Sequence, residues 1–382
     1  MTNAVRNRVV IPAGVDSDTT KPMIINGDMQ ISQRSVSTAS ITGDGFHCID
    51  RMKLDLSDNG TWTNTQSTDV PANTGFEHSL KMDCTSADSS LAAGSYHLWR
   101  YIFEAQDIKI LKKGTANAEY LTVAFYIKSN KTGTFTVEIL DEEGDDRNIS
   151  QTFTIDSADT WEKKVLSFVG DTSAAPTYDN TKGISINIWM TGGSTFTGGT
   201  LQTAWGAKTN NERADTSVNI ADSTDNEYYI TGLQAEVGDF NASTIPEFQF
   251  ESRIDNLRRC QRYFHIGVGL DGNTTGFANG SFRTNATAQI LHQFPVSMRT
   301  EPTATQIATD NIIAHDTADG NNINVDSIQS ILFNCENNIV VQYTLEGTSA
   351  AAGDGCYVYP TGSTPGIKFE AELWQLHQHN IH

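Results

Sequence analysis

The chain has 382 residues, enough for two or three domains with cores of their own, because one core rarely grows past about 250 to 300 residues. Its formal net charge of −20 argues against nucleic acid as a partner, since phosphate binding needs clustered Lys and Arg. From the length we expect two folded domains. No stretch approaches the length of a membrane span, so we expect no membrane insertion.

The composition is that of an all-β protein with many turns. Charged residues make up 19% and hydrophobic residues 38%, while Gly, Thr, Ser and Asn are abundant. The 5 cysteines include no C-x-x-C pair, and an odd number cannot be fully paired within one chain. We therefore expect small buried apolar side chains in a protein folded in a reducing cytoplasm, at Cys48, Cys84, Cys260, Cys335 and Cys356.

Residues 1–21 are a polar arm with few apolar side chains to pack. One interpretation is a docking arm that joins this chain to a larger assembly. The alternative is a disordered terminus.

Residues 22–245 carry a β-pattern, and around ten short strands separated by turn signals predict a β-sandwich or jelly roll. Residues 134–140 alternate apolar and polar side chains cleanly, and Gly144 is placed to form a hairpin tip after them. The expected strands are 23–25, 29–31, 51–56, 77–82, 96–103, 121–129, 133–140, 150–155, 162–168, 183–190 and 227–238.

Residues 246–264 are predicted to be a linker with a short helix, because Ser252 offers an N-cap with Asp255 three positions later. Strands resume in residues 265–382, for which we expect a second, smaller antiparallel domain of the β-sandwich type. Its strands are predicted at 263–270, 281–294, 331–333, 339–345, 355–359 and 367–376.

Two segments resemble a known family. Residues 231–238 read Thr-Gly-Leu-Gln-Ala-Glu-Val-Gly, and residues 259–264 read Arg-Cys-Gln-Arg-Tyr-Phe. Tail-fibre and related appendage proteins of tailed bacteriophages carry similar segments at the boundary between two domains. The run 292–302, with Phe-Pro-Val and Met-Arg, and the closing strand 369–373 resemble the C-terminal domains of that family.

The N-terminal region resembles the jelly roll of many phage fibre proteins, itself similar to carbohydrate-binding modules. The resemblance lies in residues 26–34, in Asp50 with Arg51, and in the late loops 199–206 and 221–225. This chain has Met52 where the family often has tryptophan. The resemblance covers nearly all of residues 23–264.

The resemblance implies a structural virion protein assembled in the host cytoplasm, most simply a tail fibre or receptor-binding subunit for host adsorption. It also implies a homotrimer, contact with other virion proteins through the N-terminal arm, and binding of host cell-surface polysaccharide. The first alternative is a capsid fibre or decoration protein. The second is the sugar-binding module of a carbohydrate-active enzyme.

Exposed aromatic rings are the natural platform for a sugar, because the apolar face of a pyranose stacks on them. The glycan-binding candidates lie in polar loop sequence, and they are Trp205, Trp62 and Tyr178. The tryptophans that alternate with core-like residues are expected to be packing residues, and they are Trp99, Trp161 and Trp189.

No cofactor is expected. Two groups of residues are candidates for metal binding, and each also has a simpler explanation. Asp28, Glu236 and Asp239 would hold a structural calcium if their strands lie side by side, or they are solvated carboxylates. His377 and His379 share one face of an extended strand and would meet on the axis of a trimer, or they belong to a polar tail. The run 316–320 lacks the spacing of a calcium loop.

The sequence offers no catalytic motif, and we expect no enzyme. There is no G-x-S-x-G elbow, no H-E-x-x-H and no Gly-rich phosphate loop. Glu142 and Glu143 are adjacent, so on a strand they point to opposite faces and do not flank a glycosidic bond.

Overall fold

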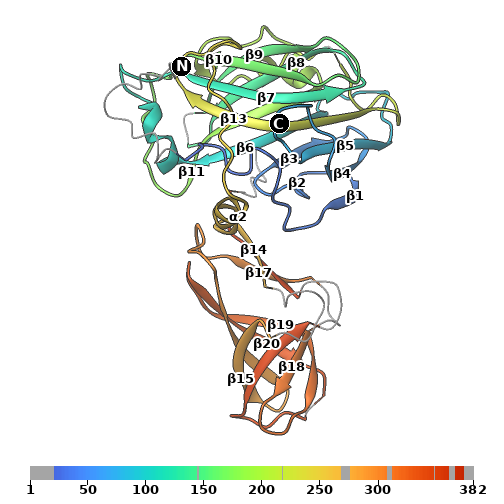
Figure 1. The fold of residues 1–382 in the computed structure, drawn as a ribbon, viewed down its shortest axis with the longest axis vertical. Helices are drawn as coiled ribbons and strands as arrows, with labels where there is room; N and C mark the ends of the chain where they lie inside the picture. The colour runs from blue at the N-terminus through green and yellow to red at the C-terminus, as the bar shows by residue number, and fades with distance from the viewer. Residues whose placement is uncertain are drawn as a thin grey trace, which may run out of the picture.

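The computed structural model describes residues 21–143, 146–216, 218–267, 276–307, 312–347, 349–360 and 366–373. These residues are mostly β-structure, arranged as a two-sheet sandwich and a small barrel with few short helices (Figure 1). The predicted all-β fold class is confirmed. The docking arm predicted for residues 1–21 lies outside the described residues, apart from Lys21.

The sandwich consists of two antiparallel sheets. The six-stranded sheet has the order β1 (Ser37–Ile41), β4 (Thr61–Ser67), β5 (Ser79–Ser86), β13 (Glu227–Val237), β7 (Leu121–Ser129) and β10 (Glu162–Phe168). The seven-stranded sheet has the order β12 (Gly206–Ala207), β9 (Arg147–Ile155), β8 (Gly133–Asp141), β11 (Lys182–Gly192), β6 (Tyr96–Glu104), β3 (Lys53–Ser57) and β2 (Gly45–Phe46). Three short helical turns lie in the connections, η1 (Ala105–Leu111), α1 (Ser194–Thr197) and η2 (Asn210–Glu212).

The core lies between the two sheets, and the alternation along the strands explains why. In β7 the side chains of Val123, Phe125 and Ile127 are fully buried in this core, as a strand with one face on the core requires. β8 and β9 form the predicted hairpin, and the Gly144 expected at its tip lies outside the described residues. The cysteines are free, and Cys335 is exposed, so the prediction that all five are buried is wrong at this position.

Residues 23–31 were predicted to be two strands, and the structure shows tight turns instead. Asn26 has φ +61°, and its side chain bonds the backbone of Ile31 in both directions. A Cβ on Gly27 would lie 2.1 Å from the carbonyl oxygen of Leu233, so only glycine permits this close approach to β13. The apolar alternation of this segment therefore reflects burial of a turn.

The helix α2 (Arg253–Gln261) follows the sandwich, and Ser252 caps it as predicted, accepting a hydrogen bond from the Asp255 backbone at 3.2 Å. No helix of the described residues is long and apolar enough to cross a membrane.

The C-terminal strands form two groups. A three-stranded sheet has the order β14 (Phe264–Gly267), β22 (Ile367–Glu370) and β17 (Thr303–Gln306). A closed barrel has the order β15 (Ala278–Thr284), β16 (Thr287–Gln293), β20 (Asn338–Leu345), β19 (Asn322–Asn334), β18 (Ile312–Asp316) and β21 (Gly355–Pro360). The expected small antiparallel unit is present, but it is a barrel and not the β-sandwich predicted for residues 265–382. The domain boundaries themselves stay predictions.

A buried ion pair joins the sandwich to the C-terminal unit. The Arg51 guanidinium lies 2.5 Å from the Glu372 carboxylate, and the two side chains are 1% and 5% exposed. Arg51 also donates to the carbonyl of Ile102 at 2.7 Å and lies 3.5 Å from the ring centre of Tyr263. A charge buried this completely is stable only while such partners surround it. A buried apolar cluster joins residues from both sides of this junction, namely Ile25, Ile31, Ile102, Cys260, Tyr263 and Leu373.

Two further contacts fix the same junction, where α2 lies between the units (Figure 1). Glu104 at the end of β6 accepts two hydrogen bonds from Arg262, at 2.7 and 2.8 Å. Arg299 donates to the carbonyls of Ala371 and Asn180, at 2.7 and 2.9 Å. The orientation of the barrel relative to the sandwich is therefore held by charged groups on both sides.

We predict that Arg51→Met destabilises the full chain by up to about 3–5 kcal/mol, because it removes the partner of Glu372 Oε2 at a buried site and leaves the carboxylate paired only through Oε1, with Arg34 at 3.1 Å. Calorimetric unfolding measures the effect. The control is Lys112→Met, since the Lys112 and Glu119 side chains are 53% and 40% exposed. Loss of that exposed pair is expected to cost less than about 1 kcal/mol. Equal stability of the two variants would contradict the structural role of Arg51.

Candidate functional site

Trp62 was a glycan-binding candidate, and the structure places it in the sandwich core. It lies in β4 and is 0% exposed. Its indole nitrogen donates a hydrogen bond to the carbonyl of Asn59 at 2.7 Å. Its ring packs edge-to-face against the His97 ring, with the two ring centres 4.7 Å apart. No ring face is open to a ligand, so this expectation is corrected. Trp62 was expected in a loop, but the turn before it ends at Gly60, where φ is +75°, and β4 begins at the next residue.

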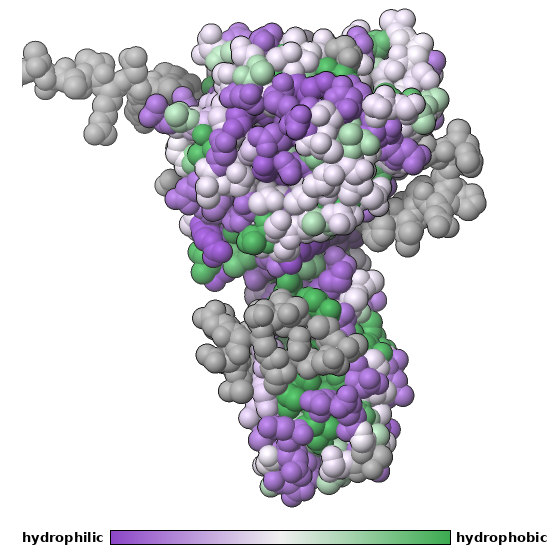
Figure 2. Space-filling model, turned by 90° about the vertical axis from the view of Figure 1, so that its right-hand side faces the viewer, coloured by the Kyte–Doolittle hydropathy of each residue, from purple (hydrophilic) through white to green (hydrophobic). Residues whose placement is uncertain are grey.

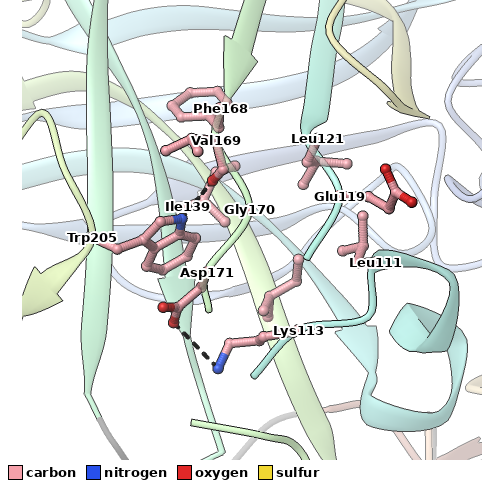
Figure 3. A pocket seen from close by; sticks show the side chains of 11 residues that line it. Leu111, Lys113, Glu119, Leu121, Ile139, Phe168, Val169, Gly170, Asp171 and Trp205 are labelled. Atoms are coloured by element: carbon pink, nitrogen blue, oxygen red, sulfur yellow. Dashed lines mark hydrogen bonds and ion pairs between the residues drawn. The ribbon is translucent and has the colours of Figure 1, made fainter. Parts of the chain in front are cut away.

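Trp205 is half-buried beside β12, at the rim of a small hollow (Figure 3). Its indole nitrogen donates to the carbonyl of Val169 at 2.6 Å, and its ring packs against the sandwich core. The hollow has a volume of about 20 Å³, which is room for about one water molecule. A sugar ring does not enter this hollow, so only the outer face of the indole remains for stacking.

Tyr178 is half-buried in the loop before β11, where its φ is +57°. The ammonium group of Lys109 lies 5.8 Å from its ring centre. The hollow beside Trp205 includes neither Tyr178 nor Trp62, so the three candidates do not line one pocket. Sugar contact by Trp205 or Tyr178 stays a prediction. Among the expected packing residues, Trp99 and Trp189 are buried and Trp161 is half-buried.

A row of polar residues crosses the outer face of the seven-stranded sheet. Cross-strand register pairs Lys53 with Arg100, Arg100 with Asn187, Asn187 with Glu138, and Glu138 with Ser150. We call these five residues the polar row. Their chain neighbours, among them Trp99, Ile186 and Val137, belong to the core, so the row lies on the opposite face.

Hydrogen bonds link the middle of the polar row into one network. Arg213, from the loop that follows η2, bonds both oxygens of Glu138 at 2.8 and 2.9 Å. Asn187 and Trp189 each donate to the same carboxylate at 3.0 Å. Arg100 donates to the Asn187 side chain at 3.1 Å, which joins the guanidinium to the network.

A second set of charges surrounds Arg100 at the more open end of the polar row. Asp55 lies 3.1 Å from its guanidinium and Glu142 lies 3.6 Å from it. Lys53 pairs with Asp55, and Lys182 lies 3.5 Å from Glu142. Glu138, Asn187 and Ser150 of the polar row are 0% exposed and closed to a ligand. Arg100 and Lys182 keep 19% and 20% of their side chains exposed, so these two groups are the part of the network that faces solvent.

Glu142 and Glu138 stay ionised near neutral pH. Burial alone would raise the pKa of Glu142, but the charges of Arg100 and Lys182 outweigh burial and lower it to about 2. Burial also opposes ionisation of Glu138, yet Arg213 lowers its pKa. Neither group is a proton donor near neutral pH, whereas paired-carboxylate glycoside hydrolysis needs one. The arrangement is suited to hydrogen bonding with a polar ligand.

The expected calcium ligands do not form a group. Asp28 is buried and accepts a hydrogen bond from Asn256, Glu236 accepts one from Gln234, and Asp239 accepts one from Ser167. Nothing brings these three carboxylates together, and the acidic group that the described residues do form lies elsewhere. His377 and His379 lie outside the described residues.

Comparison with known proteins gives remote similarities only. No family model matches the sequence, and no curated protein matches it. The enzymatically active domain of tailspike protein 4 from bacteriophage CBA120 is 14% identical, with a TM-score of 0.29. The match covers 56% of this chain and only 21% of the tailspike chain.

Two carbohydrate-related structures match over most of their own length. A putative sugar-binding protein from Bacteroides thetaiotaomicron is 11% identical, with a TM-score of 0.29, covering 57% of this chain and 100% of that one. A family 11 carbohydrate-binding module from Clostridium thermocellum, in complex with a mixed-linked tetrasaccharide, is 11% identical. Its TM-score is 0.27, and the match covers 53% of this chain and 96% of the module. Similarities this remote carry no information on what this chain binds.

The burial of Trp62 predicts a large effect on stability. Trp62→Ala should cost about 3–5 kcal/mol, because it leaves a cavity in the core. Trp205→Ala should cost about 1–2 kcal/mol, since part of that ring already lies in water. Urea unfolding of both variants measures the difference. If Trp62→Ala is no less stable than Trp205→Ala, the placement of Trp62 is wrong.

Proposed function

We propose that this chain is a structural virion protein of a tailed phage, a tail fibre or receptor-binding subunit that binds glycans on the host surface. Binding rather than catalysis is its task in this proposal. The sequence resemblance to phage appendage proteins supports the virion assignment. The charged groups around Arg100, at the open end of the polar row, support the ligand class, and they are the observation that carries the proposal.

The charged groups around Arg100 fit a carbohydrate for physical reasons. Sugar hydroxyls both donate and accept hydrogen bonds, and the network offers donors at Arg100 and Lys182 beside acceptors at Asp55 and Glu142. These groups already hold one another in place, so little conformational entropy is lost on binding. A polyhydroxylated ligand is therefore a better match than an apolar one.

Self-association as a homotrimer belongs to the same proposal. One site on one chain gives weak binding, and several linked copies raise the effective concentration of sites. Hydrophobic residues gather on the C-terminal unit (Figure 2). Its exposed large apolar side chains are Leu291, Ile307, Ile331, Leu332 and Phe333, and Phe333 is 72% exposed. A trimer interface that buries them would account for their exposure on a single chain.

Glycan binding at the polar row predicts a selective loss in one variant. On an array of bacterial surface polysaccharides, Arg100→Gln should bind about tenfold more weakly than the natural chain, because a charged donor is lost. Arg283→Gln removes an exposed arginine from the barrel and should leave binding unchanged. Thermal unfolding checks that both variants fold.

A third variant separates the two sugar surfaces. If Trp205→Ala abolishes binding while Arg100→Gln binds normally, the ligand lies on the indole of Trp205 and not on the polar row. If the natural chain binds no polysaccharide of the array, the receptor-binding proposal fails.

The position on the particle is tested by immunogold electron microscopy of purified virions, with antibody against the C-terminal unit. Label on tail appendages is the expected result. Label spread over the head would favour a capsid fibre or decoration protein. Absence from particles would contradict the virion proposal and favour a sugar-binding module of a carbohydrate-active enzyme.

A further inference from the structure

Three aspartates from two loops meet at one end of the barrel. Asp316 ends β18, Asp319 lies in the turn to β19, and Asp354 directly precedes β21. One carboxylate oxygen from each lies within 4.8 Å of the others.

Asp316 carries an unsatisfied oxygen in this group. The residue is 0% exposed, so solvent does not reach its carboxylate. Its Oδ1 accepts hydrogen bonds from the backbone nitrogens of Ala318 and Asp319, at 2.9 and 3.3 Å. Its Oδ2 is buried and accepts none. A buried carboxylate oxygen without a donor costs free energy that a bound cation would recover.

No basic side chain neutralises the three aspartates. Across the described ranges, no ion pair joins Asp316, Asp319 or Asp354 to Lys, Arg or His. The cross-strand partner of Asp316 is Cys356. Its thiol is not among the atoms that gather there, which are all carboxylate oxygens. The donors are therefore oxygens only.

We propose that Asp316, Asp319 and Asp354 bind a hard divalent cation, with Ca²⁺ as the best match. Calcium takes six to eight oxygen ligands in flexible geometry, which suits carboxylates from two loops completed by water or backbone carbonyls. The ion would tie the turn between β18 and β19 to the loop before β21. The run 316–320 contributes two ligands, and the third comes from a distant part of the sequence.

Isothermal titration calorimetry of the full chain, stripped with EDTA and titrated with CaCl₂, tests the site. One ion per chain is expected. Asp319→Asn and Asp354→Asn should each weaken binding about tenfold or more, because each removes a charged ligand. Asp326→Asn is the matched control, since Asp326 is exposed on β19 of the same barrel, and it should bind as the natural chain does.

A second measurement keeps the test independent of the variants. Ca²⁺ should raise the melting temperature of the natural chain relative to EDTA, since an ion that binds only the folded state stabilises it. Absence of both binding heat and a melting shift would overturn the site. Binding that Asp319→Asn and Asp354→Asn leave unchanged would overturn the assignment of these ligands.

Discussion

The buried guanidinium of Arg51 is the group on which the arrangement of the two units depends. Its partners come from both sides of the junction, Ile102 from the sandwich and Glu372 with Tyr263 from the C-terminal segments. A buried charge tolerates few arrangements of its partners, so we infer that this pair specifies one orientation of the barrel. Four of the segments that carry the family resemblance meet here, namely 26–34, 50–51, 259–264 and 369–373. Part of the resemblance therefore describes the junction, while the residues of the polar row and of the acidic group lie outside these four segments.

Strands with one apolar face were predicted correctly from the alternation of apolar and polar residues. The alternation misled where it came from a buried turn, as in residues 23–31, and strands without apolar alternation were missed. Residues 121–129 and 162–168 were predicted with the bounds that the structure shows. β4 was missed because its alternating threonines look like loop sequence, although Thr61, Thr63 and Thr65 have the period of a strand. The same two-residue period places Trp62 on the face of β4 opposite these threonines, which is the face buried in the core. The alternation predicts a sandwich where the structure has a barrel, because closure depends on the pairing of β15 with β21, which alternation does not encode.

The polar row was not predictable from the sequence. Its members come from five strands, and their proximity depends on a register that one sequence does not reveal. Reasoning from loop aromatics favoured Trp205, Trp62 and Tyr178, which the fold distributes over separate places. The acidic group was missed for a related reason, since the distance between Asp319 and Asp354 along the chain hides their proximity across the barrel.

The most direct test of the central claim is a crystal structure of the chain with a bound oligosaccharide from a bacterial surface polysaccharide. The account predicts sugar density on the outer face of the seven-stranded sheet, with hydroxyls within hydrogen-bonding distance of Arg100 and Glu142. Density confined to the face of Trp205, or to the barrel, would contradict it.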